Sequence, residues 1–334
     1  MPEKLPEALV DRFGRRVDYV RLSVTDRCDF RCVYCMPEDA RFVPRAEILA
    51  LEELLALGQA FVALGVRRIR ITGGEPLVRR DLPWLLERLA RLPGLDELTL
   101  TTNGSRLAEL AGTLAAAGVR RLNVSLDSLR PERFAAITRV GKLERVLAGL
   151  EAARAAGFAR IRINAVILKG RNEDEVLALV AFARAQGFDI AFIEEMPLGE
   201  ILSHDRALSF CSSDRIRADI ARSHTLIPLA TQTGGPARYY RMADSPIRVG
   251  FISPHSHNFC EQCNRVRVTA QGRLLLCLGQ EHSADLRAVL RERPGDDAAL
   301  RAAVTEAMAL KPPGHDFKVG GEVRIVRFMH HTGG

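Results

Sequence analysis

Three cysteines near the N-terminus have a spacing that suits metal ligation. Cys28, Cys32 and Cys35 form a C-x3-C-x2-C run in TDRCDFRCVYC, with no fourth ligand beside them. Structural zinc sites close with four ligands, and electron-transfer iron–sulfur clusters usually have four cysteines. A set of three therefore predicts a [4Fe–4S] cluster with one iron open to a substrate or cofactor. Zinc with a distant fourth ligand is the alternative.

A glycine-rich segment, ITGGEP, follows the cysteines and contains Gly73, Gly74 and Glu75. Glycines allow a backbone to approach a ligand closely, and the glutamate carboxylate would accept a hydrogen bond from an amine. The methionine part of S-adenosylmethionine offers an amine and a carboxylate to an open iron. One electron from the cluster would cleave this cofactor to a 5′-deoxyadenosyl radical, so the difficult chemistry belongs to the cofactor. Tyr34, between the last two cysteines, would pack against its adenine.

A second cysteine trio, again without an obvious fourth ligand, lies in the C-terminal part of the chain: Cys260, Cys263 and Cys277. From the spacing alone, a second iron–sulfur cluster is about as plausible as zinc completed by a histidine. The candidate histidines are His255, His257 and His282.

Two arginines beside this trio favour a nucleotide ligand. Arg265 and Arg267 are two residues apart in an expected strand and so project from one face. Two guanidiniums next to an open iron suit a phosphorylated ligand that also offers a nitrogen or oxygen to the metal, such as a purine nucleotide. The alternative is that Arg265 and Arg267 lie on a strand face that is exposed to solvent and bind no ligand.

The elements that must position these residues alternate as strand and helix, which predicts an α/β fold with a parallel sheet. The expected strands are Tyr19–Val24, Arg68–Thr72, Glu97–Thr102, Arg121–Leu126, Arg160–Leu168 and Asp189–Glu194. The expected helices are Leu51–Leu64, Leu82–Arg91, Arg106–Ala117, Leu143–Ala156 and Glu173–Gln186. Six such units predict a partial (β/α)6 TIM-like barrel. Its active site would lie where the strands end, at the cysteine loop and at GGEP.

The composition changes after residue 197, which predicts two regions, 1–197 and 198–334. The first would be the partial barrel. The second would be an α+β region that closes the open side of the barrel, carries the second cysteine trio and includes a hairpin turn at Gln271-Gly272.

The bulk composition predicts a cytoplasmic protein without membrane or nucleic-acid partners. The 334 residues contain no apolar run long enough to span a bilayer and no secretory signal. The net charge of +7 permits nucleic-acid binding, but only 6% of the residues are aromatic and none interleave with the arginines. A reducing compartment would keep the seven cysteines as thiols, and the remaining one, Cys211, would be a plain thiol.

The motifs RLSVTDRCDFRCVYC and ITGGEP resemble those of the radical S-adenosylmethionine (SAM) superfamily. The resemblance narrows to the GTP 3′,8-cyclase family of molybdenum cofactor biosynthesis through DRFGR, TTNG, NVSLDSL, FIEEMP, PARYY, GFISPHSHNFCEQCNRVRVTAQG and the terminal Gly-Gly. It implies two [4Fe–4S] clusters, bound by Cys28, Cys32, Cys35 and by Cys260, Cys263, Cys277.

The resemblance also implies the remaining site residues. The cofactor contacts would be Tyr34, Gly73, Gly74, Glu75, Ser125 and Met196. The GTP contacts would be Arg21, Arg68, Arg70, Thr101, Arg162, Arg265 and Arg267. Catalysis would involve Arg265, Arg267 and a C-terminal tail, Gly333 and Gly334, that reaches into the cavity.

The implied reaction is abstraction of the C3′ hydrogen of GTP by the 5′-deoxyadenosyl radical, giving (8S)-3′,8-cyclo-7,8-dihydroguanosine 5′-triphosphate. The implied partners are an external one-electron donor, a second copy of the chain in a homodimer, and the cyclic pyranopterin monophosphate synthase that receives the product.

Two positions depart from the family: Ala191 stands where arginine is common, and Arg162 where lysine is frequent. Two other functions remain open, a peptide-maturing radical SAM enzyme with an auxiliary cluster and a zinc-dependent nucleic-acid-binding protein.

Overall fold

The computed structural model describes residues 8–230, 235–320 and 325–333. Its strands form one sheet in the order β12-β11-β10-β1-β2-β3-β4-β5-β6-β9-β8-β7. The eight strands from β10 to β9 are mutually parallel, and the outer ones pair antiparallel. The strands are β1 (Tyr19–Ser23), β2 (Arg68–Thr72), β3 (Glu97–Thr102), β4 (Arg121–Ser125), β5 (Arg160–Val166), β6 (Asp189–Ile193), β7 (Leu226–Pro228), β8 (Arg238–Met242), β9 (Ser245–Ile252), β10 (Arg265–Val268), β11 (Arg273–Leu275) and β12 (Ser283–Asp285).

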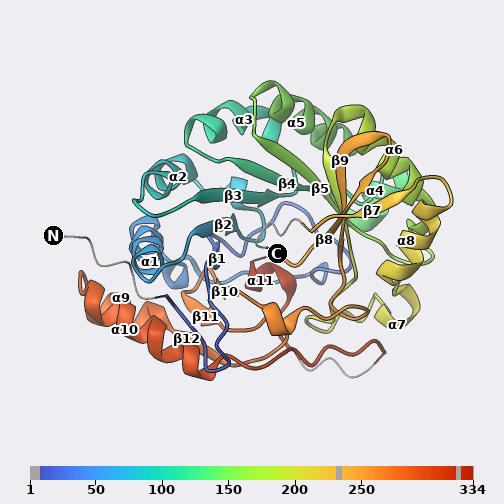
Figure 1. The fold of residues 1–334 in the computed structure, drawn as a ribbon. Helices are drawn as coiled ribbons and strands as arrows, with labels where there is room; N and C mark the ends of the chain where they lie inside the picture. The colour runs from blue at the N-terminus through green and yellow to red at the C-terminus, as the bar shows by residue number, and fades with distance from the viewer. Residues whose placement is uncertain (1–7, 231–234, 321–324, 334) are drawn as a thin grey trace.

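The sheet curves into a partial barrel, with the helices that connect its strands on the outside (Figure 1). The α-helices are α1 (Leu51–Ala63), α2 (Leu82–Ala90), α3 (Leu107–Ala116), α4 (Pro131–Thr138), α5 (Leu143–Ala155), α6 (Val176–Gln186), α7 (Arg206–Ser209), α8 (Ser213–Ala221), α9 (Leu286–Glu292), α10 (Asp297–Ala307) and α11 (Met329–Thr332). Short 3-10 turns are η1 (Arg45–Glu47), η2 (Pro76–Val78), η3 (Glu173–Glu175), η4 (Cys260–Gln262) and η5 (Met308–Leu310). The short helix α11, close to the end of the chain, lies inside the ring of strands (Figure 1).

The two faces of the barrel strands differ in polarity. Alternate positions such as Val20, Leu22 and Ile69 are fully buried in the apolar core. The positions between them carry polar and charged groups such as Arg21 and Arg70, which line an internal cavity. TIM-barrel interiors are usually filled by branched apolar side chains. A charged lining therefore indicates an interior built to hold a ligand.

The structure confirms the six predicted barrel strands to within two residues at their ends. The predicted hairpin at Gln271-Gly272 joins β10 to β11, with Gly272 at a φ of 81°. The helix α4 was not predicted. The two-region division stays a prediction, but β9 and β10 from the C-terminal region extend both edges of the N-terminal strands. Within the described ranges, no helix is long and apolar enough to cross a membrane.

Candidate active site

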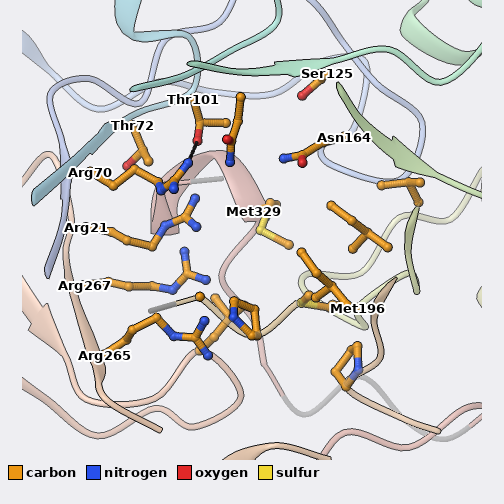
Figure 2. Close-up of a pocket in the computed structure, with 18 of the residues that line it drawn as sticks. Arg21, Arg70, Thr72, Thr101, Ser125, Asn164, Met196, Arg265, Arg267 and Met329 are labelled. Carbon is orange, nitrogen blue, oxygen red and sulfur yellow. Dashed lines mark hydrogen bonds between the residues drawn. The ribbon is translucent and has the colours of Figure 1, made fainter. Parts of the chain in front are cut away.

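All six cysteines of the two trios line one cavity of about 290 Å³ inside the barrel. Figure 2 shows Arg21, Arg70, Arg265 and Arg267 pointing into it from one side. Ser125 and Met196 face them across the cavity. The barrel thus brings together the first trio, the second trio and the arginines, although the two trios are far apart in the sequence.

The end of α4 holds the first cysteine loop. The amide of Arg31 donates to the Thr138 carbonyl at 3.0 Å, and that of Val33 to the Ile137 carbonyl at 3.0 Å. The Arg139 guanidinium donates to the carbonyls of Arg31 at 2.9 Å and Met36 at 3.1 Å. Arg139 has a φ of 63°, a strained value for a residue with a side chain. The last residues of α4 and the side chain of Arg139 therefore hold the loop that carries the thiols.

The glycines of GGEP are required by contact with the cysteine loop itself. The Gly74 amide donates to the Thr25 carbonyl at 2.7 Å, and a Cβ on Gly74 would lie 2.5 Å from the carbonyl oxygens of Asp26 and Arg27. A side chain there would push the two loops apart. The expected approach of these glycines to a ligand amine stays a prediction, because the close contact that the structure gives them is with the protein backbone.

Glu75 is fully buried and ties neighbouring loops together. Its carboxylate accepts from the Leu77 amide at 3.0 Å, the Thr102 hydroxyl at 2.7 Å and the Asn103 amide at 2.6 Å. Burial raises the pKa of Glu75 to about 7, although these donors oppose the shift. Glu75 does not line the cavity. Its expected contact with the cofactor amine remains a prediction, and its bonds to the chain give it a structural role.

The first trio has surroundings that fit an iron–sulfur cluster. The Cys28 sulfur accepts from the Phe30 amide at 3.4 Å, and the Cys35 sulfur accepts from the backbone of His330. Such N–H donors to sulfur are typical of cluster ligands. Burial raises the pKa of Cys35 to about 12 and those of Cys28 and Cys32 well above their ordinary value. Binding iron as thiolates would therefore release protons.

Arginines from three adjacent strands form a row across the sheet. Arg267 on β10, Arg21 on β1 and Arg70 on β2 occupy paired register positions. Arg70 donates to the Thr101 hydroxyl at 3.2 Å (Figure 2). Burial, together with the neighbouring charge of Arg265, lowers the pKa of Arg267 to about 10. Arg70 is buried and Arg21 and Arg267 are half-buried, and cations at this density favour a polyanion as the ligand.

The second cysteine loop is anchored by a residue of the DRFGR motif. The Arg15 guanidinium donates to the Cys260 carbonyl at 2.8 Å and to those of Pro312 and Pro313 at 2.6 and 2.8 Å. Burial by itself would raise the pKa of Cys263, but the charges of Arg265 and Lys311 lower it to about 7. Sequence reasoning assigned no role to Arg15 or Lys311.

The zinc alternatives find no support in the side-chain geometry. Within residues 8–230, 235–320 and 325–333, no three His, Cys, Asp or Glu side chains are grouped to hold a single metal ion. The His255 ring instead lies 3.0 Å from the Glu195 carbonyl, and the His257 ring 2.8 Å from the Asp214 carboxylate. A cubane, in which each thiolate binds a different iron, does not need the thiols to meet at one point.

The C-terminal tail reaches the arginines. The Gly333 carbonyl accepts from Arg21 at 3.0 Å and from Arg267 at 3.3 Å. Gly333 has a φ of 82°, and a Cβ on it would lie 2.5 Å from the Thr72 hydroxyl oxygen. Gly334 lies outside the described residues.

Most of the predicted site residues line the cavity. They are the six cysteines, Tyr34, Gly73, Gly74, Ser125, Met196, Arg21, Arg70, Thr101, Arg162, Arg265 and Arg267. Arg68 is not among the lining residues, because it lies at the start of β2 and bonds to Asp18 at 2.9 Å. Arg162 donates to the Tyr239 hydroxyl at 2.5 Å, and Ala191 is fully buried on β6. The expected Cys211 thiol is buried in the apolar core.

Sequence reasoning missed Asp127, which lines the cavity just after β4 and bonds to the first cysteine loop and to β5. It accepts from the Tyr34 hydroxyl at 2.7 Å and from the Val166 amide at 2.8 Å. Burial raises its pKa to about 6. Its position in SLDSL, directly after the fourth strand, was the available signal.

Comparison with known proteins gives matches along the whole chain. Residues 22–183 match the Radical SAM superfamily, and residues 188–317 match the family Molybdenum Cofactor Synthesis C. A GTP 3′,8-cyclase of Pseudomonas entomophila is 63% identical over 99% of this chain and 100% of its own length. The GTP 3′,8-cyclase 2 of Pseudomonas aeruginosa is 60% identical over 98% of both.

Solved structures share the fold at low sequence identity. SuiB of Streptococcus suis is 17% identical, with a TM-score of 0.58 over 80% of this chain, which spans 62% of SuiB. SuiB bound to S-adenosylmethionine gives a TM-score of 0.56 at 18% identity, over 85% of this chain and 66% of that one.

Proposed function

The chain belongs to the GTP 3′,8-cyclase family within the radical SAM superfamily, and on this premise we propose that it converts GTP to 3′,8-cyclo-7,8-dihydro-GTP. This is the first step of molybdenum cofactor biosynthesis. The observation that carries the proposal is the row of Arg267, Arg21 and Arg70 in the cavity that both cysteine trios line.

The superfamily uses one [4Fe–4S] cluster and SAM, and this chain has suitable residues for both. Cys28, Cys32 and Cys35 would hold the cluster, with N–H donors already directed at two of the sulfurs. When bound, the cluster and SAM supply a 5′-deoxyadenosyl radical that takes the C3′ hydrogen of GTP. Tyr34, Ser125 and Met196 line the same cavity and would position SAM.

The arginines would bind and orient the triphosphate. Arginine makes charge-assisted, often bidentate bonds to phosphate oxygens, each stronger than a neutral bond. Binding would offset the mutual repulsion of the guanidiniums in the row, which sit close together in a buried cavity. The enclosing strands would also exclude water and other hydrogen donors from the site.

We propose that Cys260, Cys263 and Cys277 would hold a second [4Fe–4S] cluster, which would supply a metal ligand site for the guanine of GTP. The support is the shared cavity and the adjacent Arg265 and Arg267. Because both sets of three leave one iron open, one would serve the cofactor and the other the substrate. The proposal extends to a cytoplasmic homodimer, an external one-electron donor and transfer of the product to cyclic pyranopterin monophosphate synthase.

The test is GTP-dependent release of 5′-deoxyadenosine by the anaerobically reconstituted protein. We expect GTP to stimulate release, and Arg267→Met to raise the Kd for GTP roughly 10- to 150-fold, the effect of losing about 1.5–3 kcal/mol from a charged hydrogen bond. Arg222→Met is the matched control, because that side chain is 77% exposed. Release that does not respond to GTP would refute the proposed substrate.

A further inference from the structure

Lys311 is a buried cation next to the second cysteine trio. It is only 1% exposed. Its ammonium group donates to the Leu276 carbonyl at 2.8 Å, to the Arg265 carbonyl at 3.0 Å and to the Cys263 sulfur at 3.5 Å. An ammonium has three protons, so these contacts use its full donor capacity.

The backbone around Lys311 fixes the position of this charge. Lys311 directly follows η5, and its amide donates to the Met308 carbonyl at 3.1 Å. Arg15 holds the next two residues through the carbonyls of Pro312 and Pro313. A Cβ on Gly314 would lie 3.4 Å from the Cys260 sulfur. One short segment therefore contacts two of the three cysteines.

Such a charge requires an anion. Burying an unpaired ammonium costs several kcal/mol. Among the described residues, no carboxylate forms an ion pair with Lys311, and its oxygen partners are neutral carbonyls. Arg265 and Arg15, the other charges that act on Cys263, are also cations, and the Asp11 carboxylate nearby pairs with Arg15 at 2.6 Å and not with Lys311. The remaining partner is the Cys263 sulfur, which becomes anionic as a metal-bound thiolate.

We propose that Lys311 is a positioning residue of the second cysteine site, where its ammonium balances the negative charge of a thiolate-bound cluster and fixes Cys263 relative to Arg265. The inference rests on the proposed second cluster. Lys311 does not line the cavity, so it acts through Cys263 and the Arg265 backbone and not by touching the substrate.

A positive charge next to a cluster favours its reduced form, which carries one more negative charge. Lys311→Met removes the charge and keeps most of the side-chain volume. We expect the variant to retain both clusters and to shift the second cluster to a more negative midpoint potential. A tenfold change in the ratio of reduced to oxidised cluster corresponds to about 59 mV for one electron, and a shift of at least this size is expected.

The experiment is an electron paramagnetic resonance titration of the reconstituted holoenzyme with iron analysis, in wild type, Lys311→Met and Lys311→Arg. Lys169→Met, at an exposed lysine, is the matched control and should keep the wild-type potential. An unchanged potential in Lys311→Met with both clusters present overturns the proposal. Loss of the second cluster in Lys311→Met but not in Lys311→Arg supports a need for charge, and loss in both overturns it in favour of packing.

If the second cluster does not form at all, iron analysis of the wild-type protein gives a different result. Wild-type protein with about four irons per chain, instead of about eight for two [4Fe–4S] clusters, would refute the proposed second cluster before any variant is compared.

Discussion

Replacement of Arg139 tests whether this residue holds the first cysteine loop in place before iron binds. Its side chain is 15% exposed, and its guanidinium donates to the carbonyls of Arg31 and Met36 on either side of Cys32 and Cys35. Arg139→Ala removes both bonds, and with them an exposed bond to the Ser203 hydroxyl at 3.1 Å, but keeps the backbone strain at a φ of 63°. Arg139→Gly removes the same bonds and relieves the strain.

These contacts determine how much each substitution should lower the free energy of unfolding. Two hydrogen bonds from a charged donor contribute about 1.5 kcal/mol each at the lower end of their range, so Arg139→Ala should lower the free energy of unfolding by about 3 kcal/mol. A residue with a side chain pays about 1–2 kcal/mol at positive φ. Glycine avoids most of this strain energy. It also makes the unfolded chain more flexible, which offsets part of the gain in stability. Arg139→Gly should therefore be destabilised by about 2 kcal/mol and be the more stable variant.

The assay is urea unfolding of the iron-free, reduced protein, followed by circular dichroism. Arg145→Ala on the exposed face of α5 is the control, and its free energy of unfolding should change by less than about 0.5 kcal/mol. If Arg139→Ala behaves like this control, the two carbonyl bonds do not stabilise the loop. If Arg139→Ala is as stable as Arg139→Gly, the strain argument is wrong.

Two further predictions concern Glu75 and Gly333. Burial raises the pKa of Glu75 from 4.5 to about 7 in the folded protein. The protonated carboxyl group therefore stabilises the fold fully below pH 4.5, and this stabilisation is lost as the pH rises through about 7. The free energy of unfolding should fall by on the order of 3 kcal/mol across this window. Unfolding measured across this window should show that fall in wild type and not in Glu75→Gln, and identical pH profiles would contradict it. Gly333→Ala should displace the tail carbonyl, because its Cβ would meet Thr72 at 2.5 Å, and slow GTP-dependent product formation by roughly tenfold, as for about 1.4 kcal/mol. Gly295→Ala has a similar φ of 79° with nothing within 4 Å, so an equal loss of activity in that control would rule out the tail as the cause.

The barrel strands were predictable because each carries its own local pattern. Every second residue of β1 to β5 is apolar and buried against the helices, so the alternation is visible within a few residues. The pairing of β9 with β6 and of β10 with β1 was not predictable in the same way. It joins segments from distant parts of the chain, and no local pattern specifies which edge a strand will extend.

The residues of the candidate site differ in the same way: some could be predicted from the local sequence, and others only from the fold. Cysteine spacing and the arginine pair point to their chemistry from residue type alone. The role of Gly74 depends on which backbone packs against it, and that of Glu75 on three donors from other loops. Lys311 gave no signal, because a single lysine before two prolines is ordinary until the fold buries it.

The pairing of β10 with β1 and of β9 with β6 also affects how the chain is made. The six barrel strands leave the ribosome before either of these partners exists, so both edges of the nascent sheet expose unpaired backbone groups. Such edges are prone to pair with other chains. Once the C-terminal strands β9 and β10 have been made, they cover both of these edges. We therefore expect newly made chains to depend on chaperones until about residue 270 has emerged. This takes on the order of a minute at typical elongation rates.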